Sequence, residues 1–215
     1  MPIVFNESAG TISGISVGGL PDGIVDTDML AAGAVTETKR GAGAILQVVY
    51  QRDNTRRKFA SISAGSWTGD FTQVNTTITP KRASSILLFD VCIHYGVHNQ
   101  QNTGAGFWQV QEDKGGTVTT PNTLNGDTGQ DYPSFSHHRA SYGASGMQYT
   151  TNKAIISGNV MPATDTTART YKFYFRVQNG DDVCVNRDAS NSSDSNQGVH
   201  SPTLTSHCRI MEVAQ

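Results

Sequence analysis

Hydrophobic and polar residues alternate along much of the chain after residue 43. The clearest example is the segment 84–97. One set of alternate positions is wholly apolar or aromatic, namely Leu87, Phe89, Val91, Ile93 and Tyr95, and the other set is mixed, namely Leu88, Asp90, Cys92 and His94. Because successive side chains of a strand point to opposite faces, this pattern predicts a β-strand with one buried face.

The same reasoning predicts further strands along the chain. The expected strands are residues 44–52, 57–63, 70–79, 84–97, 106–112, 153–161, 169–178, 182–186 and 203–214. No credible helix is expected after residue 40. Many short strands joined by turn residues predict an all-β fold, an antiparallel β-sandwich or jelly roll.

The mixed faces of the central strands predict a contact between subunits. When one face of a strand fills the core of its own domain, a half-apolar second face is typical of an interface. The residues expected there are Leu88, Asp90, Cys92 and His94, with Tyr174 and Arg176 from the segment 169–178. An unpaired Asp90 would be costly on such a strand. We expect it to form a structural ion pair with Lys172 or Arg176, in preference to a catalytic role.

The first forty residues follow a different pattern. Residues 11–20 are rich in glycine, and Pro21-Asp22-Gly23 is a turn signal. Thr27 can cap a short helix over residues 28–34, which is too short to persist alone in water. We therefore expect residues 1–43 to be an anchor or stalk and residues 44–215 to be a β-sandwich knob. The apolar residues expected to make the anchoring contact are Ile24, Val25, Met29 and Leu30.

Two long polar segments, 115–148 and 188–201, interrupt the strands. Loops of this length in a compact domain are usually functional or mobile. The first segment combines aromatic rings with hydrogen-bonding groups, a combination suited to carbohydrate. The candidate contact residues are Tyr132, Tyr142, Asn122, Asn125, Asp127, Asp131, His137 and His138. The alternative is that the tyrosines hold the loop against its own sandwich.

Composition excludes several classes of function. The chain has 215 residues and a formal net charge of −2, which leaves no electrostatic footprint for nucleic acid. No stretch approaches the roughly 20 apolar residues of a membrane span, and no secretory signal is visible. The short basic clusters, Lys39-Arg40, Arg56-Arg57-Lys58 and Lys81-Arg82, are interpreted as solvated loop edges. The odd number of cysteines, three, predicts buried thiols in place of a disulfide framework.

We expect neither catalysis nor a cofactor. There is no HExxH or P-loop sequence. His137 and His138 are adjacent, so in an extended segment they point to opposite faces and cannot easily hold one ion. No ligand set has structural-zinc spacing, so no metal is expected, although a symmetry axis could gather copies of one histidine.

An ordered set of short motifs resembles a tail-fibre-like domain found in many tailed bacteriophages, notably those of cyanobacteria. The motifs are AILQVV at 44–49, TTITPKRASSILL at 76–88, ATDTTARTYK at 163–172 and RIMEVAQ at 209–215, preceded by GGLPDGIVDTDMLA at 18–31. The resemblance implies a protein of the virion, a trimeric β-sandwich knob and contact with the host surface. The layout of a Gly-rich stem before an aromatic-rich sandwich is also similar to the C1q/TNF-type trimeric jelly roll.

The predicted function is therefore a structural fibre protein of a tailed phage, working as a homotrimer in the virion. Its N-terminus would dock on a tail or capsid protein, and its knob would contact the host, with a cell-surface polysaccharide as the candidate ligand. The alternative is a capsid decoration or head-fibre protein, which the chain length of 215 residues favours. A polysaccharide-degrading tailspike is disfavoured because no β-helix repeats are visible.

Overall fold

The structure is a computed structural model, and the chain divides into two compact units, residues 1–40 and 41–215. It describes residues 4–6, 8, 11–13, 36, 39–68, 70–98, 105–126, 134–139, 151–177, 181–187 and 203–215. In the first unit, β1 (Val4–Asn6) pairs antiparallel with β2 (Thr11–Ser13). The predicted helix 28–34 and the anchor residues Ile24, Val25, Met29 and Leu30 lie outside the described residues.

The second unit contains two antiparallel sheets. The first of these sheets is built around one long strand, β7 (Ile86–His98). Its other strands are β3 (Ile45–Asp53), β4 (Arg57–Ile62), β11 (Asn152–Pro162), β13 (Asp181–Val185) and β14 (Ser206–Val213). β11 runs along one edge of β7, while β14 and β13 pair with successive parts of the other edge. β3 then pairs with β14, and β4 pairs with β13.

The second sheet is built on the pair β8 (Ala105–Lys114) and β12 (Arg169–Val177). Four short strands complete it: β5 (Trp67–Thr68), β6 (Thr76–Ile78), β9 (Thr117–Thr119) and β10 (Ser136–Arg139). β5 and β6 flank β12, whereas β9 and β10 flank β8. A 3-10 turn, η3 (Thr72–Val74), and one helical turn, α1 (Asn122–Asn125), connect these strands.

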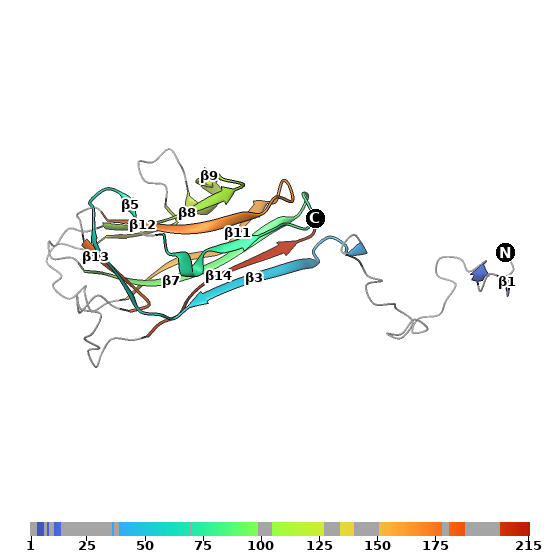
Figure 1. Ribbon diagram of the computed structural model, residues 1–215, viewed down its shortest axis with the longest axis horizontal. Helices are drawn as coiled ribbons and strands as arrows, with labels where there is room; N and C mark the ends of the chain where they lie inside the picture. The colour runs from blue at the N-terminus through green and yellow to red at the C-terminus, as the bar shows by residue number, and fades with distance from the viewer. Residues whose placement is uncertain are drawn as a thin grey trace. The chain divides into compact units, whose positions relative to one another are not determined.

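The two sheets stack as a sandwich (Figure 1), and aromatic rings fill the space between them. The ring centroids of Phe89 and Tyr171 lie 4.7 Å apart, and those of Tyr95 and Trp108 lie 5.5 Å apart. Every second residue of β7 and of β12 is buried, as the alternation in the sequence predicts. The predicted all-β sandwich is therefore confirmed.

Two details of the predicted strands are wrong. Residues 70–79 do not form one strand, because buried Phe71 and Val74 are three residues apart, which suits the 3-10 turn η3. Alternation holds only from Val74 through Thr76 to Ile78. The segment 115–148 was expected to be a loop without a helix, yet it contains β9, α1 and β10. Buried Leu124 holds the single helical turn α1 against the core.

Cys184 and Cys208 are buried free thiols, as predicted, and Cys92 is half-buried. Burial raises the pKa of the Cys208 thiol to about 12, so it stays protonated and behaves as a small apolar side chain. Among the described residues, no helix is long and apolar enough to span a membrane.

Candidate functional site

The outer face of the first sheet carries ordered rows of side chains across β3, β14, β7 and β11. Residues paired across antiparallel strands point to the same face, so the registers define each row. The first row is Ile45, Val213, Ile86 and Pro162, and the second row is Val48, Met211, Leu88 and Val160. We call these two adjacent rows the apolar rows.

The apolar rows are open to solvent in the single chain. Ile45, Val48 and Val160 are 53%, 51% and 42% exposed. Tyr50 and Ile155 are exposed on the same face. These five residues are all but one of the six exposed large hydrophobic residues in the described part of the chain. Monomeric proteins rarely expose a large contiguous apolar patch, so this face is a candidate contact surface.

A polar row follows the apolar rows and contains Asp90. Asp90 Oδ2 lies 2.6 Å from Arg209 Nη2 and 3.7 Å from His207 Nε2, both on β14. The predicted structural pairing of Asp90 is confirmed as an inter-strand ion pair, but the predicted partners were wrong. Lys172 instead binds Asp113 at 2.7 Å, because β12 belongs to the other sheet.

His94 and Cys92 extend this outer face beyond the polar row. Cys92 Sγ lies 3.6 Å from His94 Nε2, and His207 pairs across the strands with Cys92. Burial, and then the nearby Lys153 and His207, lower the pKa of His94, so its ring is neutral near pH 7. No group of three or more metal-ligating residues occurs within the described parts of the chain.

The six predicted interface residues fall on two faces. Leu88, Asp90, Cys92 and His94 lie on the outer face of the first sheet, whereas Tyr174 and Arg176 lie on the outer face of the second. A cyclic trimer joins two different patches of each subunit, so residues on two faces are compatible with one assembly. The interface itself stays a prediction.

The structure describes four of the eight predicted carbohydrate residues. Asn122 is exposed at the start of α1, but Asn125 is 1% exposed and binds the backbone of Val110. Its assignment as a glycan contact is wrong, because no ligand can reach it. His137 and His138 are in β10, opposite Phe107 and Gly106 of β8. The remaining candidates, Tyr132, Tyr142, Asp127 and Asp131, lie outside the described residues.

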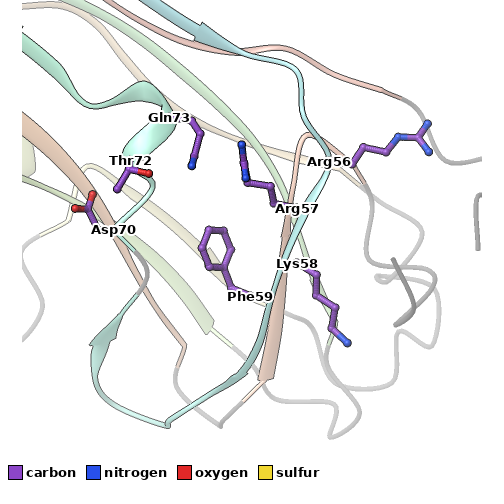
Figure 2. A pocket seen from close by; sticks show the side chains of 7 residues that line it. All are labelled: Arg56, Arg57, Lys58, Phe59, Asp70, Thr72 and Gln73. Atoms are coloured by element: carbon purple, nitrogen blue, oxygen red, sulfur yellow. The ribbon is translucent and has the colours of Figure 1, made fainter. Parts of the chain in front are cut away.

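A pocket of about 400 Å³ lies between β4 and η3. Arg57 and Phe59 of β4 form one wall, and Asp70, Thr72 and Gln73 form the other (Figure 2). Arg56 and Lys58 also line it, but their side chains point away from its centre. Arg56 Nε donates to Thr203 Oγ1 at 2.9 Å, and Lys58 Nζ lies 2.9 Å from Asp182 Oδ2.

This pocket was missed in the sequence because the cluster Arg56-Arg57-Lys58 was interpreted as a solvated loop edge. All three side chains are half-buried, and Arg57 and Lys58 belong to the predicted strand 57–63, which the structure contains as β4. Alternation from Arg57 to Phe59 was the available signal, since it puts a cation and an aromatic ring on one face. The opposite wall could not be anticipated, because η3 replaced a predicted strand.

A scan of protein-family models and a search of curated proteins found no match to this sequence. Among solved structures, the chain is similar to the "Structure of infectious bursal disease virus Gt strain" with 9% identity and a TM-score of 0.39, covering 78% of this chain and 42% of that chain. For the "Structure of infectious bursal disease virus Gx strain" the identity is 7% and the TM-score 0.35, covering 80% and 43%. The chain therefore spans less than half the length of either viral chain.

Proposed function

We propose that this chain is a non-enzymatic structural protein of a tailed-phage particle whose β-sandwich unit assembles into a homotrimer. The observation that carries the proposal is the pair of apolar rows, exposed on one face of the first sheet. The ordered motifs that resemble a phage tail-fibre-like domain support the assignment to a virion. No catalytic constellation was found in the sequence, which agrees with a structural role.

A second copy of the chain is the occupant that fits this face best. Protein interfaces combine an apolar centre with a polar rim. Here the apolar rows form the centre, and the row containing Asp90 and Arg209 borders it. In a trimer, three weak contacts with a host surface act together, and the resulting avidity can hold a cell.

The oligomeric state tests this assembly. We expect native mass spectrometry of the full chain to show a trimer, and Val48→Asp to convert it to monomers, since a charge would be buried among apolar residues. The matched control is Val118→Asp on β9, because Val118 is 53% exposed and lies outside the apolar rows. A wild-type monomer at micromolar concentration would contradict the trimer. Equal dissociation of both variants would show that the apolar rows are not the interface.

The position on the particle distinguishes two forms of the proposal. As a fibre, the chain would dock through residues 1–43 on the tail, with the knob facing the host. As a capsid decoration, the same assembly would sit on the shell. Gold-labelled antibody against the knob, imaged on intact particles, separates them: label at the tail supports the fibre, and label on the capsid supports the decoration protein.

A further inference from the structure

We propose that the pocket between β4 and η3 binds one acidic monosaccharide unit of a surface polysaccharide. This inference rests on the proposed function, because it gives the host contact of the knob a site and a ligand class. It places a contact outside the segment 115–148, of whose candidate residues Asn125 is buried.

The size of the pocket suits a single ring. Its volume of about 400 Å³ is at the lower end of the range of small-molecule sites, about 300–1,000 Å³. A polysaccharide could therefore place one unit inside while the neighbouring units pass over the surface.

One wall offers an apolar ring. Phe59 is only partly buried. Its ring packs edge-on against the ring of Phe175 of β12, with centroids 5.1 Å apart. This contact ties the ring to the core and fixes its orientation. A fixed aromatic ring provides the flat apolar surface on which the C–H face of a sugar can rest.

The other wall offers fixed polar groups. Buried Val74 holds the 3-10 turn that carries Thr72 and Gln73. Asn75 Nδ2 donates to Asp70 Oδ1 at 2.6 Å, which orients that carboxylate. A hydroxyl, an amide and a carboxylate together can both donate to and accept from the hydroxyl groups of a sugar.

The guanidinium of Arg57 on the pocket wall favours an acidic sugar. Arg56 and Lys58 point away from the centre of the pocket, and Lys58 is paired with Asp182, so Arg57 is the cation that a ligand inside the pocket would meet. Arg57 Nε faces Asp53 Oδ2 at 3.6 Å, and the end of the guanidinium points along the pocket wall toward Gln73 (Figure 2). A guanidinium matches a carboxylate in a two-bond geometry. The sugar carboxylate would lie at Arg57, and the hydroxyl groups would lie near Asp70.

The test uses the full chain, titrated by calorimetry with trigalacturonate, with a sialic acid trimer and with the methyl ester of each. We expect at least one acid to bind and its ester to bind at least tenfold more weakly. Arg57→Gln should weaken binding by about ten- to a hundredfold, the effect of losing a hydrogen bond to a charged group. The matched control is Lys81→Gln, which removes the same charge near Gln47, at the far end of β3.

Gln73→Ala gives a second variant in case the loss of Arg57 disturbs β4, and it should weaken binding several-fold without lowering the melting temperature. Equal affinity of acid and ester, or of wild type and both pocket variants, would overturn the site. A trimer that binds none of the probes would also overturn it and leave the assembly standing. Conversely, a monomer that binds an acid would support the pocket and overturn the trimer.

Discussion

At the scale of single residues, Glu212 shows how a buried charge is held in this sandwich. The residue is completely buried in β14, and its carboxylate accepts hydrogen bonds from backbone and side chains. Its donors are Lys81 N at 2.8 Å, Arg82 N at 3.0 Å, Ser85 Oγ at 2.6 Å and Gln47 Nε2 at 2.6 Å. Burial alone would raise the pKa of Glu212, but these donors together outweigh it and hold the pKa below the usual 4.5.

The lowered pKa predicts how stability depends on pH. Because the pKa of Glu212 is lower in the folded state than in the unfolded state, its ionisation stabilises the fold above pH 4.5. This contribution is lost as the pH falls through the folded-state pKa. Glu212→Gln should cost about 2–3 kcal/mol at pH 7, since donors that faced a carboxylate would meet an amide.

Urea unfolding of wild type and Glu212→Gln at pH 7 and at pH 3 measures the effect. We expect the difference in unfolding free energy between the two proteins to shrink at pH 3, because this pH is below the unfolded-state pKa and the unfolded wild-type chain takes up a proton there. A difference that is the same at both values would show that the charge of Glu212 contributes nothing.

At the scale of elements, Asn125 completes the edge of β8 at Val110, between the parts that β10 and β9 cover. β10 pairs with residues 105–108 and β9 with residues 112–114, which leaves Val110 between them. Asn125 Oδ1 accepts from Val110 N at 2.7 Å, and Asn125 Nδ2 donates to Val110 O at 2.6 Å. One side-chain amide thus takes the place of a paired strand residue.

Removing this amide should weaken the second sheet. Asn125→Ala leaves both backbone groups of Val110 buried without partners, which costs about 2–4 kcal/mol of unfolding free energy. Asn122→Ala is the matched control, because Asn122 is exposed on the same helical turn and should change stability by less than about 0.5 kcal/mol. Chemical denaturation of both variants at pH 7 measures this, and similar losses would contradict the role of Asn125.

The sequence predicts well those strands in which the alternation of apolar and polar residues is itself sufficient to identify a strand. β7 and β12 are long, and their strict alternation is sufficient to identify a strand with one buried face. β5, β9 and β10 have two to four residues each and form only because β12 and β8 offer a free edge. A local pattern contains no information about such an edge.

The candidate sites divide in the same way. Leu88, Asp90, Cys92 and His94 could be placed on one outer face, because alternation along β7 decides it. The partner of Asp90 could not be predicted, because Arg209 lies beside Asp90 only through the pairing of β14 with β7. An Asn in a polar segment is typical of an exposed loop, so the sequence predicts that Asn125 is exposed. It is buried because of the path of the chain around β8, which no local pattern indicates.

At the scale of the whole molecule, Cys92 can report how far a subunit contact extends from the apolar rows. It lies on the same outer face, in the row with His207 and Ile155, and is half-buried in the single chain. Burial is the main cause that raises the pKa of this thiol, so labelling should be done above pH 8. Cys184 and Cys208 are buried in the core of the sandwich and serve as internal references.

If the trimer covers this row, iodoacetamide should label Cys92 slowly in the wild type and at least tenfold faster in Val48→Asp, because only the subunit contact is lost. Val118→Asp should label at the wild-type rate, and Cys184 and Cys208 should stay slow in all three proteins, since the fold is intact. Mass spectrometry of the digested chain measures each site separately. A trimeric wild type whose Cys92 reacts as fast as in Val48→Asp would confine the contact to the apolar rows and leave His94 and Cys92 outside it. Faster labelling of the two buried cysteines in Val48→Asp would instead mean that the variant unfolds, and the contact would then have to be tested with the milder Val48→Thr.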